Sequence, residues 1–233
     1  MMISEQLSLP VAIDGQATFD NFYAPNGTPQ HMAIFLLQDD MRKFAYLSGA
    51  EGSGLSHLLQ AACQTSALSR APQGLYLPLR ELKGFPPGQV LEGLASANMV
   101  CIDDLDQVSD HDDWQIPLFN FFNDCRDSGC RLVIAAHKSV DSLGVTLPDL
   151  SSRLKSGVSL HLPNYDDADQ RRLLQHRANR RGLYLSNEVA TFLLHRLPRD
   201  SATLMRALND LDKASLQEQR RLTLPFVKAT LSL

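Results

Sequence analysis

Five short apolar runs, separated by stretches of helical periodicity, constrain the fold of the first two thirds of the chain. The runs are largely unbroken by polar residues, which is typical of strands buried on both faces of a parallel sheet. They lie at residues 44–47, 75–79, 99–102, 132–136 and 158–162. Helical patterns fall between them near residues 54–69, 86–97 and 114–127. This alternation predicts an α/β domain whose parallel sheet is sandwiched by helices.

The pattern after Pro163 is helical throughout. Helices are predicted at residues 166–181, from a cap at Ser186 to a stop before Pro198, at residues 200–217, and from Thr223 onward. Pro78, in the second apolar run, predicts an edge strand or a strand end, because proline has no N–H for the ladder. The sequence therefore predicts three parts, which are a flexible tail at residues 1–15, the α/β domain at residues 16–163 and an all-helical domain at residues 164–233.

Composition excludes several classes of protein. The 233 residues are 44% hydrophobic and 21% charged, which is ordinary for a globular protein and excludes disorder of the whole chain. No apolar run is long enough to span a membrane, and the N-terminus has no basic, apolar signal pattern, so we expect a cytoplasmic protein with no membrane partner. The four cysteines show neither CxxC nor zinc spacing and are interpreted as reduced thiols.

The charge balance argues against a protein that wraps nucleic acid. The formal net charge is −4 and the isoelectric point is about 5.9. A basic helix face that could touch DNA or a partner is made by Arg171, Arg172, Arg177, Arg180 and Arg181. We interpret it as a solvated face, because acidic residues elsewhere leave no large positive field.

A glycine-rich segment at residues 48–57 follows the first apolar run and precedes a helix. Its spacing matches the phosphate loop G-x-x-x-x-G-K-[ST], except that Leu55 replaces the lysine. Such glycines let backbone N–H groups converge on phosphate oxygens, and the helix N-terminus adds partial positive charge. The predicted contacts are Gly49, Gly52, Ser53, Gly54, Leu55, Ser56 and His57. The alternative is a plain glycine-rich turn.

Two carboxylates end the third apolar run, about 50 residues after the loop. In a Walker B arrangement Asp103 would hold Mg²⁺ together with the Ser56 hydroxyl, and Asp104 would lie where a water-polarising acid belongs. The alternative is that acidic residues simply end a strand. Strand, loop and helix in this order predict nucleotide binding. Because Leu55 cannot supply charge to a transition state, we expect no independent ATP turnover.

Four segments together resemble the AAA+ domain of the bacterial replication initiator DnaA. They are residues 18–22, the loop and helix start at 49–61, residues 102–105, and residues 147–154. The resemblance covers about residues 16–233 and stops where the initiator continues into its helix-turn-helix domain. It implies an AAA+ sheet with a C-terminal helical lid and no sequence-specific DNA binding.

The same resemblance assigns roles to single residues. Arg153 resembles the arginine finger that reaches a neighbour's γ-phosphate. Arg199 matches the sensor 2 arginine, which projects from the lid onto the nucleotide phosphates, and Asn21 and Phe22 fall where the family contacts the base. His137 occupies the sensor 1 region, where the initiators place aspartate, and this departure leaves its role undefined.

The N-terminal segment carries a further resemblance, to the pentapeptide that binds the bacterial sliding clamp. Its residues are Gln6, Leu7, Ser8, Leu9 and Pro10. A flexible tail can offer two leucines and a proline to an apolar groove, with the glutamine as a hydrogen-bonding anchor. The alternative is a leader strand that packs on its own domain.

Taken together, the resemblances imply a regulator of replication initiation. It would join the DNA-loaded sliding clamp to ATP-bound DnaA and stimulate ATP hydrolysis by the initiator in trans, which prevents re-initiation. Its own nucleotide would be ADP or another nucleoside diphosphate with Mg²⁺, and homo-oligomerisation is left open. Two alternatives remain, an autonomous AAA+ ATPase of helicase-loader type and a DNA-binding regulator.

Overall fold

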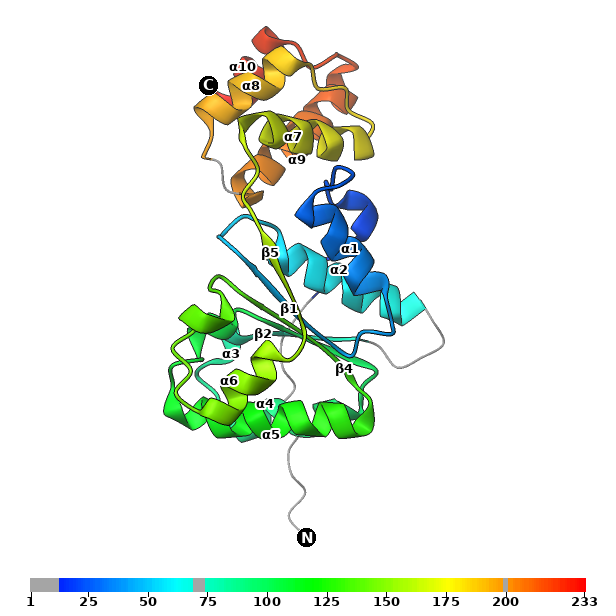
Figure 1. Ribbon diagram of the computed structural model, residues 1–233. Helices are drawn as coiled ribbons and strands as arrows, with labels where there is room; N and C mark the ends of the chain where they lie inside the picture. Colours follow the sequence, from blue (N-terminus) through cyan, green and yellow to red (C-terminus); the bar gives the residue numbers. More distant parts are fainter. Residues whose placement is uncertain (1–12, 69–73, 199–200) are drawn as a thin grey trace. The chain divides into compact units, whose positions relative to one another are not determined.

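A computed structural model of the chain describes residues 13–68, 74–198 and 201–233. The chain divides into two compact units, Met1–Pro163 and Asn164–Leu233 (Figure 1). The clamp-like segment Gln6–Pro10 and the sensor 2 candidate Arg199 lie outside the described residues. From Asp14 onward the N-terminal segment is held to the first unit, because the Asp14 N–H donates to Gln60 and the Asp14 carbonyl accepts from Gln64. The anchored part therefore begins within the predicted tail.

The first unit is built on a five-stranded sheet in which every neighbouring pair of strands is parallel. The strands are β1 (Phe44–Gly49), β2 (Leu75–Pro78), β3 (Met99–Asp103), β4 (Arg131–Ala136) and β5 (Val158–Leu162). Their order is β2-β3-β4-β1-β5. The predicted fold class is confirmed. Pro78 ends β2, an edge strand, where its missing N–H costs the ladder nothing.

Helices cover both faces of this sheet (Figure 1). One layer holds α1 (Pro29–Gln38) and α2 (Leu55–Leu68), and the other holds α3 (Leu79–Leu82), α4 (Pro87–Leu91), α5 (Asp112–Ser128) and α6 (Pro148–Lys155). Alternate strand residues feed the two cores: Tyr46 packs in the cluster with α5, and Ala45 and Leu47 pack in the cluster with α2. This burial on both faces explains the continuous apolar runs.

The helix predicted at residues 86–97 is wrong in extent. The α-helix α4 stops at Leu91, and a separate 3₁₀ turn covers Leu94–Ser96. Gly93 between them has φ +74°, a left-handed conformation that glycine adopts at no steric cost and that ends a helix. Further short 3₁₀ turns lie at Phe19–Asn21, Leu105–Gln107 and Val140–Ser142.

The connection that follows β1 crosses the opposite face of the sheet from the later connections. From β1 the chain enters α2 on one face of the sheet, whereas the connections after β2, β3 and β4 run through helices on the other face. In open parallel sheets, ligands bind in the crevice outside the carboxyl ends of the strands at such a change of face. The ends of β1 and of its neighbours β4 and β3 are therefore the place to look for a site.

The second unit consists of α7 (Asp167–Arg180), α8 (Asn187–Arg196), α9 (Ser201–Glu218) and α10 (Leu224–Leu231). The Asp166 carboxylate accepts from the Asp169 N–H, and the Ser186 hydroxyl accepts from the Val189 N–H, so α7 and α8 both begin at capping side chains. Their apolar faces meet in one core around Leu174, Leu193 and Leu208. No helix among the described residues has the length and apolar character needed to cross a membrane.

Candidate functional site

The glycine-rich loop is a tight turn between the end of β1 and the start of α2. A Cβ on Gly49 would lie 2.5 Å from the Ser53 Oγ and 2.7 Å from the Leu162 carbonyl oxygen, so no larger residue fits there. Gly52 and Gly54 have φ values of +83° and +95°, which other residues rarely adopt. The Ser53 N–H donates to the Ala50 carbonyl at 3.0 Å and closes the turn. The sequence pattern thus coincides with a backbone that requires its glycines.

The start of α2 presents unused backbone donors beside this turn. The first N–H of α2 with a backbone partner is that of Leu58, which donates to the Gly54 carbonyl at 3.1 Å. Within the described residues, no carbonyl accepts from the N–H groups of Gly54, Leu55 or Ser56. Free N–H groups at the positive end of a helix dipole form a site for an anion.

Leu55 places an apolar side chain where a phosphate loop has its lysine. It is 3% exposed and packs in the core between α2 and the sheet. The loop therefore brings its backbone donors, and no Lys or Arg side chain, toward a bound anion.

The segment before α1 folds over the loop. The ring of Phe22 is buried, and a Cβ on Gly54 would lie 2.5 Å from the Phe22 Cε2. The Phe22 and His57 rings are 5.3 Å apart, and His57 Nε2 lies 2.7 Å from the Thr18 carbonyl oxygen. The Asn21 side-chain amide donates to the Gln16 carbonyl at 2.9 Å. The structure thus brings Phe22 and His57 together at Gly54, and Asn21 directly precedes Phe22 in the chain.

The carboxylate of Asp103, at the end of β3, is 2% exposed and has hydrogen bonds to both oxygens. Its Oδ1 accepts from the Asp104 N–H at 2.9 Å, and its Oδ2 accepts from the Tyr76 hydroxyl at 2.7 Å. Burial, and next the charge of Asp103, raise the pKa of Tyr76 well above its usual range, so the phenol stays a donor. Ser56 lies close enough to the phenol to oppose this shift of the Tyr76 pKa. The predicted metal ligands Ser56 and Asp103 therefore meet around Tyr76, which the sequence analysis missed.

The Asp104 carboxylate contacts side chains that follow the two strands on either side of β3. Its Oδ1 lies 3.3 Å from the Arg80 guanidinium and 3.3 Å from His137 Nε2. His137 Nδ1 in turn lies 3.0 Å from the Gly49 carbonyl oxygen. Burial and the neighbouring Asp103 raise the pKa of Asp104, while Arg80 and His137 oppose that rise. Arg80, Asp104, His137 and Gly49 follow or end β2, β3, β4 and β1 in turn, so one polar network runs along the carboxyl edge of the sheet.

The carboxylates do not form a complete metal site by themselves. In the part of the chain that the structure describes, no group of three or more His, Cys, Asp or Glu side chains is placed to hold a metal ion. Mg²⁺ usually takes one or two carboxylates and completes its shell with water and substrate phosphates. Asp103 and Ser56, which both lie beside the Tyr76 hydroxyl, fit that mode of binding.

Arg153 lies away from the loop, on α6 in the helical layer opposite α2. Leu150 and Leu154 are buried on the inner face of α6 and orient that helix. Among the described residues, none forms an ion pair or hydrogen bond with the Arg153 guanidinium. Lys155, two residues on, is paired with Asp141 at 2.6 Å. The structure therefore brings the loop, Phe22, His57 and Asp103 together and leaves Arg153 apart from them.

Comparison with known proteins gives one match within the second unit and one over nearly the whole chain. A family model described as the lid domain of Hda matches residues 167–231. An uncharacterized protein of Haemophilus influenzae is 41% identical over 240 residues, covering 99% of this chain and 100% of that protein.

Solved structures extend the likeness over the α/β unit. Domain III of the replication initiation protein DnaA from Thermotoga maritima gives a TM-score of 0.75 at 20% identity, covering 95% of this chain and 98% of that one. AMPPCP-bound DnaA from Aquifex aeolicus gives a TM-score of 0.69 at 20% identity, covering 88% of this chain and 67% of that one. The predicted likeness to DnaA is confirmed at the level of the fold. The chain therefore belongs to one family with the Haemophilus influenzae protein, its residues 167–231 match the lid domain of Hda, and its fold is that of the DnaA AAA+ domain.

Proposed function

We propose that this protein is a regulator of replication initiation that stimulates ATP hydrolysis by the initiator DnaA in trans. The observation that carries the proposal is the unpartnered Arg153 guanidinium on α6, on the other side of the sheet from the helix that follows the protein's own phosphate loop. An arginine placed in this way is poorly situated to serve its own site and is available to a neighbour's. The experiment that tests it is the rate of ATP hydrolysis by DnaA with the Arg153 variants described in the Discussion.

The chemistry assigned to Arg153 is stabilisation of charge on a phosphoryl group in transfer. A guanidinium donates two parallel hydrogen bonds to phosphate oxygens and stays charged at every physiological pH. Its face of α6 is fixed by the burial of Leu150 and Leu154, so the side chain can be presented to a partner without refolding.

The protein's own nucleotide would be ADP or another nucleoside diphosphate, held in the crevice at the end of β1. The backbone donors of the loop, from Gly49 to His57, would bind the phosphates, and Asn21 and Phe22 would lie near the base. Arg199 would be a further phosphate ligand. Mg²⁺, held by Asp103 and Ser56 together with phosphate oxygens, would neutralise phosphate charge. The nucleotide would act as a structural element, because the buried Leu55 gives the loop no charge for hydrolysis.

We expect isothermal titration calorimetry to show ADP binding at least as tightly as ATP. The lysine that Leu55 replaces would meet the β- and γ-phosphates, so its absence weakens the γ-phosphate site most. Identifying the nucleotide that copurifies with the protein provides an independent reading. A strong preference for ATP in the titration would contradict this assignment.

The second partner is the DNA polymerase sliding clamp, bound through Gln6, Leu7, Ser8, Leu9 and Pro10. Replacing Leu7 and Leu9 together by alanine should abolish clamp binding in surface plasmon resonance, since buried leucine anchors contribute about 1.5–3 kcal/mol each. The melting temperature should stay at the parent value. A large drop in melting temperature would instead indicate a segment packed on its own domain.

An autonomous ATPase of helicase-loader type is the alternative for the α/β unit. It would need Asp104 free to polarise water, yet Arg80 and His137 both lie 3.3 Å from that carboxylate. Steady turnover of ATP by the isolated protein would favour this alternative.

A further inference from the structure

The two units carry opposite net charge. Residues 1–163 hold ten Lys and Arg and eighteen Asp and Glu, a net charge of −8. Residues 164–233 hold twelve Lys and Arg and eight Asp and Glu, a net charge of +4. The acidic total of −4 therefore conceals a basic lid domain, and such asymmetry between parts of a chain is typical of proteins with an anionic partner.

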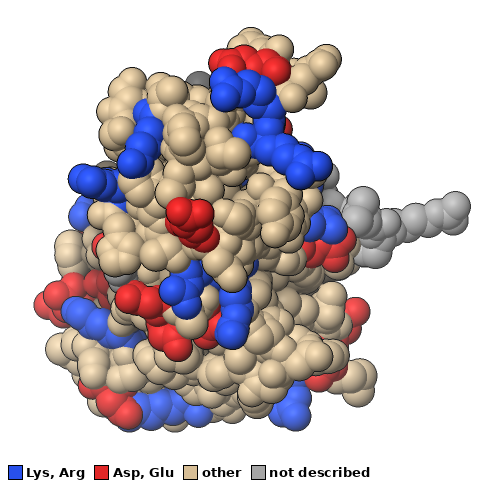
Figure 2. Space-filling model, turned by 90° about the horizontal axis from the view of Figure 1, so that it is seen from above, with Lys and Arg blue, Asp and Glu red and all other residues tan. Residues whose placement is uncertain are grey.

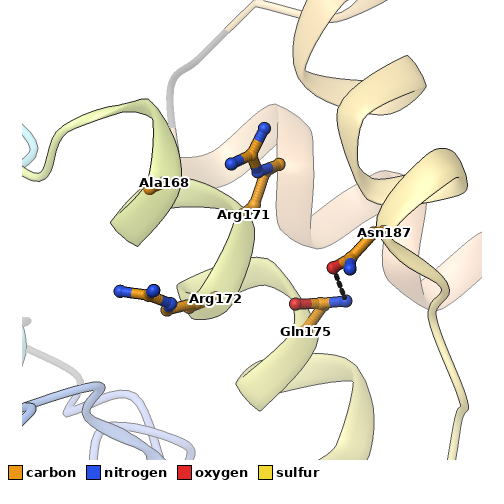
Figure 3. A pocket seen from close by; sticks show the side chains of 5 residues that line it. All are labelled: Ala168, Arg171, Arg172, Gln175 and Asn187. Carbon is orange, nitrogen blue, oxygen red and sulfur yellow. Dashed lines mark hydrogen bonds between the residues drawn. The ribbon is translucent and has the colours of Figure 1, made fainter.

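A cavity of about 310 Å³ lies within this lid, between α7 and the start of α8 (Figure 3). It is lined by Ala168, Arg171, Arg172, Gln175 and Asn187. Figure 3 shows Arg171, Arg172 and Gln175 fanning out from α7, with Gln175 meeting Asn187 across the gap. The polar side chains of the cavity thus include two guanidinium groups and no carboxylate.

The hydrogen bonds around the cavity leave donors available. The Gln175 amide nitrogen donates to the Leu185 carbonyl at 2.9 Å and to the Asn187 Oδ1 at 3.0 Å. The second of these bonds occupies the Asn187 Oδ1 and leaves the Asn187 NH₂ group available as a donor. Arg172 lies 3.2 Å from the Asp169 carboxylate, whereas no described residue forms an ion pair or hydrogen bond with the half-buried Arg171 side chain.

We propose that this lid cavity binds the phosphate backbone of DNA, through Arg171 and Arg172 and with the Asn187 amide as a further donor. A guanidinium matches phosphate geometry bidentately, and contacts of this kind position a protein on DNA without reading sequence. Figure 2 shows Lys and Arg side chains at the surface of the face that it draws. The proposal rests on the charge and cavity of the lid, independently of the role of Arg153.

The experiment measures binding of the full-length protein to a short fluorescein-labelled duplex of mixed sequence at salt concentrations from about 50 to 200 mM. The parent should bind with a salt-dependent affinity that is equal for two unrelated duplexes. Arg171→Ala with Arg172→Ala should weaken binding at least about tenfold and reduce the slope of log K against log salt by about two, one for each arginine.

The matched control is Arg206→Ala with Lys213→Ala, which removes the same charge from the same domain at exposed positions outside the cavity. It should change affinity far less. A second probe is Asn187→Asp, which keeps the acceptor for Gln175 and suits the first turn of α8, but replaces the cavity's amide donor by a negative charge. It should weaken DNA binding while the melting temperature stays at the parent value.

Three outcomes overturn the proposal. In the first, the parent protein shows no salt-dependent DNA binding. In the second, the cavity variants bind DNA as tightly as the matched control does. In the third, the cavity variants keep DNA binding and lose only the binding of inorganic phosphate or of an acidic protein. Competition by inorganic phosphate separates a free phosphate site from a site for the DNA backbone.

Discussion

Replacing Arg153 by alanine should eliminate stimulation of DnaA ATP hydrolysis in a mixture that contains clamp and DNA. An arginine finger supplied in trans is worth about 10³–10⁵ in rate, which makes this the largest effect expected of any single substitution here. Because the Arg153 side chain has no ion pair or hydrogen bond among the described residues, its removal should leave folding, nucleotide binding and clamp binding intact. Radiolabelled ATP bound to the initiator gives the readout.

Two further variants separate geometry from charge. Arg153→Lys should rescue little, since an ammonium group is a point charge without the planar fork of a guanidinium. Lys155→Ala removes the same charge two residues along α6, where the parent side chain is paired with Asp141, and should keep stimulation near the parent level. If Arg153→Ala stimulates hydrolysis as well as the parent does, the finger assignment is wrong, and regulation must act through a conformation induced in the initiator.

Most of the fold could be predicted from the sequence because its signals are local. A strand buried on both faces needs a continuous apolar run, so β3 and β4 are visible in the sequence without knowledge of their neighbours. The lid helices could be predicted equally well, since Ser186 caps α8 where the helical periodicity begins. The helix at residues 86–97 was predicted too long because the left-handed conformation of Gly93 interrupts it.

The site could be predicted only in part, because its second half depends on strand order. The loop and Asp103 are each short segments with recognisable spacing. Tyr76 and Arg80 have no such pattern, and they reach the carboxylates only because β2 pairs with β3. Similarly, His137 meets the Gly49 carbonyl only because β4 lies beside β1. The burial of the Leu55 side chain likewise depends on how α2 packs against the sheet.

Gly54→Val should abolish nucleotide binding in calorimetry, for two reasons that the structure separates. A φ of +95° is strained for any side chain and most of all for a β-branched one, at a cost of about 1–2 kcal/mol. In addition, the new Cβ would lie 2.5 Å from the Phe22 Cε2, so the ring that covers the loop must move. Both changes disturb the N–H groups at the start of α2 that would meet the phosphates.

A matched pair distinguishes these two causes. Gly52→Ala imposes comparable strain, at φ +83°, but its Cβ would meet nothing within 4 Å. Gly54→Ala imposes strain and also displaces Phe22. If the cover formed by Phe22 matters for binding, Gly54→Ala should lose far more affinity for ADP than Gly52→Ala under conditions where both proteins are fully folded. Equal losses would mean that backbone strain alone disables the loop, and a Gly54→Val protein that binds ADP as the parent does would place the nucleotide somewhere else.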